Sequence, residues 1–374
     1  MSNLIGSYLL LSDIHLGHNR TTTDFIVDNL RKFFKKYDKD IKKTDMVVIT
    51  GDTFDRLLSA NSHDARLAYS WLTELLLYCR DNGLKLRILE GTPSHDWKQV
   101  KLLDEIVSKG HIDVDFKYVD DIEIEFIRLG DYELSILYIP DEIEETADEV
   151  LDRVKEVMKE NELDKVDIIW MHGAFKYQLP IKNLDFLHDE KTYNKLTNFT
   201  INVGHVHNQS QFEKILCPGS FDRLTFADEN DPKGGWIVNL YDDYNVKYKF
   251  LENKSATTFK TIDLTKEDYK KITKILERVK DFANIRLLVD KSDSTVELIK
   301  ELKFKYPNIH FVIKTVDKDE EIKLTDEEEI SKRELFTFKL TKDNIKELVL
   351  NELNEEEKNN KLLIEELDLL LKEQ

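Results

Sequence analysis

The first third of the chain alternates short apolar runs with stretches whose apolar residues recur every three or four positions. The short runs predict buried strands at Tyr8–Ser12, Met46–Thr50 and Leu84–Leu89. The longer period between them predicts helices near Phe25–Lys36 and Ala65–Asp81. This order of strands and helices indicates a parallel sheet of the α/β class, whose functional groups gather where the strands end.

Shorter apolar runs dominate the next part of the chain and surround one amphipathic helix near Thr146–Asn161. We expect strands at Ile122–Ile127, Leu134–Ile139, Asp167–Met171, Thr200–Val203, Phe212–Leu216, Gly235–Leu240 and Val246–Leu251. These later strands should form a mixed or antiparallel sheet that faces the first sheet. The expected fold class is therefore α/β, a two-sheet β-sandwich flanked by helices.

A polar stretch at Glu252–Thr257 marks a boundary, and we expect a main domain at residues 1–254. Residues 255–316 should form a small α/β domain, with strands at Phe259–Leu264, Ile285–Val289 and His310–Lys314 and helices at Lys266–Phe282 and Ser294–Lys305. Residues 317–374 form a tail with nineteen acids and ten bases. Its expected helices are Thr341–Leu353 and Glu355–Lys372. The leucine-rich face of the second helix would cover either this protein or a partner.

Composition narrows the classes of protein to which the chain can belong. Lys plus Arg is 55 and Asp plus Glu is 74, so the net charge is -19, which argues against a generally basic protein that coats nucleic acid. Two cysteines, Cys79 and Cys217, exclude a disulfide framework and fit buried apolar positions. No apolar stretch reaches the ~18 residues that span a bilayer, so we expect a soluble, cytoplasmic protein.

Five of the ten histidines stand directly after predicted strands, beside glycine or aspartate. The segments are Asp13-Ile-His15, Gly51-Asp52, Gly91-Thr-Pro-Ser-His95-Asp96, His172-Gly173 and Gly204-His205-Val206-His207. Side chains two residues apart on an extended chain point to the same side, so each such pair can reach one ion. Imidazole and carboxylate ligands together suit manganese, iron or zinc. The sequence thus predicts a metal site at the strand ends.

This ordered set resembles the calcineurin-like metallophosphoesterase superfamily, whose motifs are D-x-H, G-D, G-N-H-D, H before glycine and G-H-x-H. The resemblance implies two divalent cations, manganese in the first place, with iron, magnesium or zinc as alternatives. It implies one ion held by Asp13, His15, Asp52 and His207, and another held by Asp52, His172, His205 and the residue at the asparagine position, here Ser94. It also implies that His95 is the catalytic imidazole and that Asp96 orients it.

The segment from Cys217 to Phe226, followed by Lys233 and Gly234, is similar to a pattern of the SbcD family of DNA repair nucleases. This resemblance implies a homodimeric 3′–5′ exonuclease or endonuclease, with residues 255–316 as a DNA-binding capping domain. The C-terminal helices would bind the coiled coil of an SbcC-type ATPase. Asp55 replaces a histidine that handles the substrate phosphate in such nucleases, and His63 is the other candidate for that role.

The expected reaction is two-metal hydrolysis of a DNA phosphodiester bond, in which His95 protonates the departing 3′ oxygen. Two alternatives stay open. The same site suits a phosphatase or a nucleotide or cyclic-nucleotide phosphodiesterase, and the departures at Ser94 and Asp55 allow a catalytically inactive binding scaffold. For DNA, the acidic chain would need positive charge from its ions, its capping domain or its partner.

Overall fold

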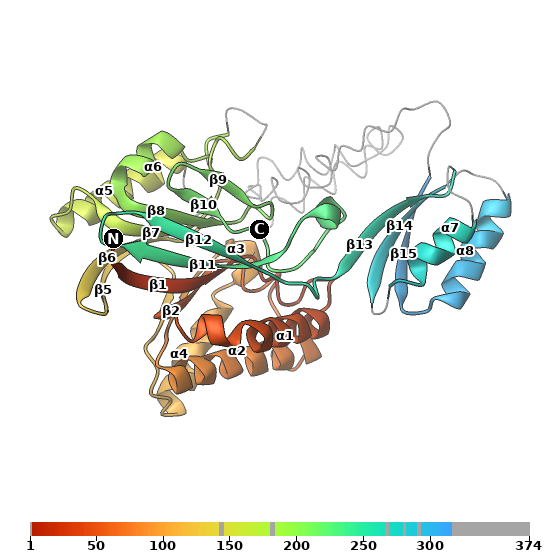
Figure 1. Cartoon of the computed structure of the whole chain (residues 1–374), viewed down its shortest axis with the longest axis horizontal. Helices are drawn as coiled ribbons and strands as arrows, with labels where there is room; N and C mark the ends of the chain where they lie inside the picture. Colours follow the sequence, from red (N-terminus) through yellow and green to blue (C-terminus); the bar gives the residue numbers. More distant parts are fainter. Residues whose placement is uncertain are drawn as a thin grey trace, which may run out of the picture. The chain divides into compact units, whose positions relative to one another are not determined.

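A computed structural model describes residues 2–141, 146–179, 184–265, 269–279, 282–289 and 293–315. The chain divides into two compact units, residues 1–326 and 327–374, and every described residue belongs to the first. The helices expected in the acidic tail lie outside the described residues. The α/β class is confirmed, because mixed sheets are flanked by helices (Figure 1). None of the described helices has both the length and the apolar character needed to cross a membrane.

The first sheet has six strands, of which four are parallel neighbours. Its order is β12 (Val246–Glu252), β11 (Gly234–Tyr241), β1 (Leu4–Leu11), β2 (Met46–Thr50), β3 (Lys85–Leu89) and β4 (Phe116–Val119). The prediction that β11 and β12 belong to the second sheet is wrong. β11 pairs antiparallel with β1, with Leu10 opposite Trp236, because the outer edge of a buried strand needs partners for its backbone groups.

The second sheet also has six strands and is mixed. Its order is β5 (Glu123–Leu129), β6 (Tyr132–Ile139), β7 (Val166–His172), β8 (Thr197–Gly204), β10 (Ile215–Cys217) and β9 (Ser210–Phe212). The single strand expected at Phe212–Leu216 is two short antiparallel strands. The chain reverses between them at Glu213, whose φ is 50°. β6, β7 and β8 are parallel, so their carboxyl ends lie on one edge.

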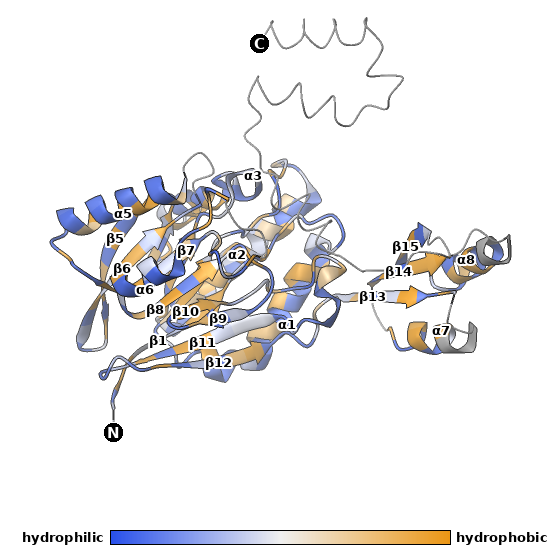
Figure 2. Ribbon diagram, turned by 90° about the horizontal axis from the view of Figure 1, so that it is seen from above, coloured by the Kyte–Doolittle hydropathy of each residue, from blue (hydrophilic) through white to orange (hydrophobic). Residues whose placement is uncertain are grey.

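Helices cover the outer faces of both sheets, and a shared apolar cluster joins the inner faces. Leu9 of β1 packs with residues of α1 (Thr23–Ile41), α2 (His63–Asn82) and α4 (Leu102–Lys109). Tyr8 of β1 packs instead with Trp170 of β7, in a cluster that draws on both sheets. α5 (Ala147–Glu160) and α6 (Glu190–Leu196) cover the second sheet. In Figure 2 many strands are orange while α5 is largely blue, as expected for a solvated outer layer.

A third, smaller sheet consists of three parallel strands, β13 (Thr258–Asp263), β14 (Ala283–Val289) and β15 (Ile309–Thr315). α7 (Tyr269–Leu276) and α8 (Asp293–Lys305) connect them, so the expected β-α-β-α-β order is confirmed. α7 ends at Leu276, before the end of the helix predicted over Lys266–Phe282. The boundary predicted after residue 254 falls between β12 and β13.

Candidate metal centre

The predicted ligands converge where strands of both large sheets end. β1, β2 and β3 lead into Asp13, His15, Asp52 and His95, and β7 and β8 lead into His172, His205 and His207. Three groups form, within each of which the ligand atoms lie within 4.8 Å of one another: Asp13 with His15 and His207, His15 with Asp52 and His95, and Asp52 with His172 and His205. His15 and Asp52 each belong to two groups, so the three groups are one continuous cluster.

The spacing of the ligand atoms suits bound cations. Ligand atoms bonded at about 2.1 Å to one ion, at angles of about 90° to 110°, lie about 3.0 to 3.4 Å apart. The Nε2 atoms of His15 and His207 are 3.1 Å apart, and His172 Nε2 is 3.3 Å from Asp52 Oδ1. His207 Nε2 is 3.9 Å from Asp13 Oδ1. These buried Asp and His side chains therefore fit a metal ion.

Backbone contacts fix the group of Asp52, His172 and His205 in place. His172 donates from Nδ1 to the Thr50 carbonyl at 2.8 Å, which turns Nε2 toward Asp52. A Cβ atom at Gly51, whose φ is 87°, would collide with the His172 ring. A Cβ atom at Gly204 would collide with the Thr50 carbonyl. Glycine at both positions lets the two sheets approach closely enough to share ligands.

Four of the expected ligands have left-handed backbone conformations. The φ angles are 48° at Asp13, 55° at His15, 49° at Asp52 and 97° at His205. Such conformations cost of order 1–3 kcal/mol each and cluster at functional sites. Hydrogen bonds hold them here, for example from the His205 amide to Asp13 Oδ1 at 3.0 Å. These left-handed turns, held by such hydrogen bonds, therefore direct the side chains into the cluster.

Two of the buried imidazoles, His15 and His172, have raised pKa values. Burial lowers the pKa of His15, but the hydrogen bond to Asp55 and the nearby carboxylates outweigh burial and raise it to about 9. Burial also lowers the pKa of His172, but the charge and hydrogen bond of Asp52, together with the charges of Asp13 and Asp141, outweigh burial and raise it. Burial and neighbouring imidazoles lower the pKa of His205 to about 3 and that of His207 to about 4. His15 and His172 thus hold protons that a cation would replace.

Asp55 faces a metal ligand, which changes its expected role. Its Oδ1 lies 3.1 Å from His15 Nδ1, so the carboxylate accepts from that nitrogen and leaves Nε2 for the cluster. The prediction that His63 handles substrate phosphate receives no support from its contacts. His63 Nε2 lies 3.0 Å from Asp24 Oδ1, and both side chains are exposed. Asp55 therefore orients His15.

Thr92, rather than Ser94, brings a hydroxyl group to the group of Asp52, His172 and His205. Thr92 Oγ1 lies 3.4 Å from each of Asp52 Oδ2, His172 Nε2 and His205 Nδ1. Ser94 follows Thr92 by two residues, and its carbonyl accepts from the Trp97 indole at 2.8 Å. Thr92 is therefore the better-placed hydroxyl candidate beside Asp52, His172 and His205. Counting forward from Gly91, instead of backward from His95, would have found it.

Asp52, rather than Asp96, orients His95. His95 Nδ1 lies 2.9 Å from Asp52 Oδ2, and the ring is partly exposed. The buried Asp96 carboxylate accepts from the amides of Phe54 and Gly91, each at 2.7 Å. Asp96 therefore ties together the turns after β2 and β3, and its expected contact with His95 is replaced by that of Asp52.

The segment after His207 supports the ligands from behind. Lys233 is buried, and its Nζ donates to the His207 carbonyl at 2.9 Å and to Asp228 Oδ1 at 2.6 Å. The Ser220 amide donates to the same carbonyl at 3.1 Å. Cys217 is a buried free thiol, and burial raises its pKa to about 12, so it serves as an apolar residue. This segment holds the His207 loop in place.

An acidic residue that sequence reasoning missed also lines the cluster. Asp141 follows β6, and its side chain is hydrogen-bonded to Thr92. Burial raises the pKa of Asp141 to about 6, against the charge of the nearby His172. Its sequence context, Ile-Pro-Asp, has no metal-ligand spacing, so only the parallel pairing of β6 with β7 brings it here.

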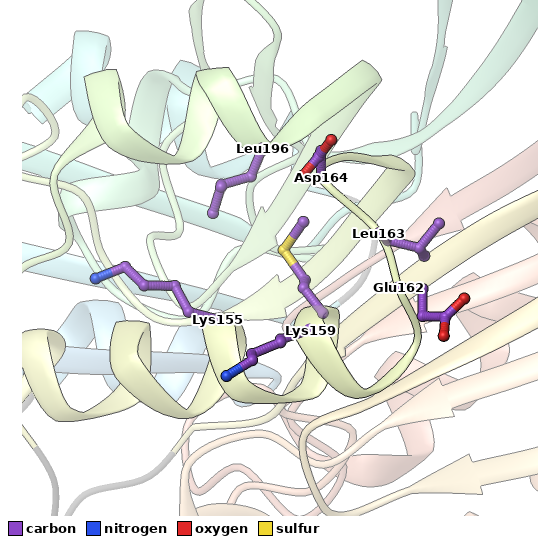
Figure 3. Close-up of a pocket in the computed structure, with 7 residues that line it drawn as sticks. Lys155, Lys159, Glu162, Leu163, Asp164 and Leu196 are labelled. Atoms are coloured by element: carbon purple, nitrogen blue, oxygen red, sulfur yellow. The ribbon is translucent and has the colours of Figure 1, made fainter.

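A separate hollow of about 420 Å³ lies between the end of α5 and α6 (Figure 3). Its lining residues are Lys155, Met158, Lys159, Glu162, Leu163, Asp164 and Leu196. The two lysines are offset by the two acids, and the lining contains no imidazole or thiol. The hollow is therefore distinct from the candidate metal centre.

Manganese affinity should rise with pH. Below a pKa of about 9, His15 in the metal-free protein holds a proton that binding must displace. We expect up to about a tenfold gain in affinity per pH unit for each proton released, across the range from pH 7 to 8.5. Calorimetric titration in buffers of different ionisation enthalpy measures both affinity and proton release. Affinity that stays constant over this range would contradict the assignment.

Asp55→Ala should weaken manganese binding about 10- to 100-fold, because His15 loses the acceptor that fixes its tautomer. Equilibrium dialysis followed by metal analysis measures the change. Asp40→Ala is the matched control, since Asp40 is a surface acid paired with Lys249. Equal affinities for both variants would show that Asp55 has no role in orienting His15.

Thr92→Val and Ser94→Ala should show which hydroxyl group, that of Thr92 or that of Ser94, joins Asp52, His172 and His205 in holding a cation. Valine keeps the shape of threonine without its hydroxyl, so we expect about a tenfold or larger loss of affinity for one of two manganese ions. Ser94→Ala should leave both affinities unchanged. Manganese titration followed by electron paramagnetic resonance counts the bound ions. The opposite result would restore Ser94 as the ligand.

Comparisons with known proteins give no family or activity. No family model matches the chain, and no curated protein matches it. One solved structure aligns over 67% of this chain and 100% of its own, with 12% sequence identity and a TM-score of 0.39. A likeness at that level identifies no function.

Proposed function

We propose that this protein is a metal-dependent phosphodiesterase with a metallophosphoesterase fold, and specifically a DNA nuclease of the SbcD type. The observation that carries the proposal is the position of Asp52, whose two oxygens face different groups of ligands. Oδ2 lies 3.6 Å from His15 Nε2, and Oδ1 lies 3.3 Å from His172 Nε2. A carboxylate shared in this way suits a pair of cations. The order of the motifs along the chain supports the same family.

The ligands divide into two sets around Asp52. Asp13, His15, Asp52 and His207 would hold one cation, and Asp52, Thr92, His172 and His205 would hold the other, with manganese as the first choice and iron, magnesium or zinc as alternatives. Bound cations would neutralise charge on the phosphoryl oxygens and make water more acidic. His95, oriented by Asp52, would donate a proton from Nε2 to the departing oxygen.

The choice of DNA as substrate rests on the segment from Cys217 to Phe226 and on Lys233, which resemble the SbcD pattern. Lys233, which belongs to this pattern, has a structural role, because its buried contacts hold the His207 loop. The same proposal includes a homodimer in the cytoplasm and an SbcC-type ATPase bound by the C-terminal helices. Residues 255–316 would then cap the substrate.

His95→Ala should lower turnover about 10²- to 10⁴-fold, since it removes the proposed general acid. Manganese affinity should change much less, because neither of the two proposed ligand sets that share Asp52 includes His95. The assay uses end-labelled single-stranded and duplex DNA with manganese, and compares them with p-nitrophenyl phosphate.

Each other outcome of this assay has a distinct meaning. Hydrolysis of p-nitrophenyl phosphate without cleavage of DNA would favour a phosphatase. Cleavage of neither, together with failure to bind manganese, would favour an inactive scaffold. Full DNA cleavage by His95→Ala would remove His95 from the mechanism.

A further inference from the structure

Two exposed apolar side chains stand beside the candidate metal centre. Trp97 is 55% exposed and Leu57 is 59% exposed. Trp97 follows His95 by two residues, so its Cα atom lies within about 7 Å of that of His95. Leu57 follows Asp55, which contacts His15. Large apolar side chains at such exposure usually mark a surface that binds something.

The buried side chain of Gln99 joins the segments that carry these two residues. Its Oε1 accepts from the Leu58 amide at 2.8 Å. Its Nε2 donates to the carbonyls of Arg56 and Asp96, each at 3.0 Å. The segment with Leu57 and the segment with Trp97 are therefore one rigid unit, and both begin at residues of the metal centre.

The backbone holds Trp97 in an unusual conformation. Its φ is 51°, and that of Lys98 is 53°, so two consecutive residues with long side chains are left-handed. This conformation is rare for bulky residues and costs of order 1–3 kcal/mol. The indole Nε1 donates to the Ser94 carbonyl at 2.8 Å, and the Lys98 amide donates to Glu90 Oε1 at 2.7 Å. The hydrogen bonds hold the strained backbone in place, so the indole ring stays exposed to solvent and does not pack into a core.

We propose that Trp97, with Leu57, forms the apolar wall of a subsite that binds the base of a nucleotide next to the scissile phosphate. A flat indole face suits a flat heteroaromatic ring, and stacking accepts every base. The inference rests on the proposed phosphodiesterase activity and assigns residues that bind the base next to the bond that is cleaved. It concerns a wall for the base and assigns no chemical step to Trp97.

Two esters with the same leaving group test the wall by activity. Thymidine 5′-(p-nitrophenyl phosphate) carries a base, and ethyl p-nitrophenyl phosphate does not. In the manganese-loaded full chain, Trp97→Ala should lower the ratio of kcat/KM for the first ester to that for the second by about 5- to 150-fold. The change should lie mainly in KM, and Trp97→Phe should recover most of it.

Phe126→Ala is the matched control, because Phe126 is 50% exposed on β5 and does not belong to the unit that Gln99 holds together. This variant should leave the ratio unchanged. A ratio that Trp97→Ala also leaves unchanged, or equal losses for both esters, would overturn the base-binding wall. Hydrolysis of neither ester by the wild type would instead refute the proposed activity.

A binding measurement tests the wall without turnover. Trp71 and Trp170 are buried, at 3% and 0% exposure, and Trp236 is partly buried on β11, where its indole donates to the Pro218 carbonyl at 3.2 Å. Added nucleotide should therefore quench mainly the exposed Trp97. With magnesium, thymidine 5′-monophosphate should quench the wild-type emission, whereas 2-deoxyribose 5-phosphate should not. Trp97→Phe should abolish the quenching. Equal quenching by both ligands, or quenching that survives in Trp97→Phe, would overturn the inference.

Discussion

The buried negative charge of Asp52 is the constraint on which the rest of the site depends. Asp52 is 1% exposed and sits at a left-handed turn between the two large sheets. A carboxylate in such a place is stable only when partners compensate it. Burial raises its pKa, but the charges and hydrogen bonds of His172 and His95 outweigh burial and hold the pKa well below its ordinary value. The folded chain thus keeps an anion where a cation fits.

This constraint explains why glycines and strained turns gather around Asp52. A carboxylate that faces ligands from both sheets requires their strand ends to approach closely, and the side chains of other residues would fill that space. The contacts at Gly51 and Gly204 illustrate this, since a Cβ atom at either would meet a ring or a carbonyl. The fold therefore gives up backbone freedom and local stability to bring the ligands together.

Much of the site follows from the sequence, because residues directly after parallel strands must share one edge of a sheet. This reasoning places Asp13 and Asp52 at one edge of the first sheet, and His172 at one edge of the second, without knowledge of any side-chain geometry. It does not reveal roles within the site. Asp55 and Asp96 are both carboxylates near histidines in the sequence, yet one binds His15 and the other binds backbone amides. Rotamers and tertiary contacts decide such choices.

In the fold, too, local sequence patterns predict the strands, whereas contacts between distant segments decide how the strands pair. The apolar runs locate the strands of both sheets, but strand pairing depends on which edge is left unpartnered. β11 therefore joins β1 across more than 200 residues, against the expectation from chain order. Thr92 is a similar case on a smaller scale. Compared with the G-N-H-D motif, two additional residues stand between Gly91 and His95. They form the start of the helical turn α3 (Pro93–Asp96), so Thr92, directly after the glycine, faces the cluster.

In the proposed role, the acidic character of the chain becomes an argument for where phosphate binds. With a net charge of -19, most of the surface repels a polyanion. Two divalent cations would bring four positive charges to a pocket whose carboxylate ligands, Asp13 and Asp52, bring two negative ones. The pocket would then be a local positive site on a negative molecule. Phosphate would be drawn to the metal centre because the rest of the described surface competes poorly for it.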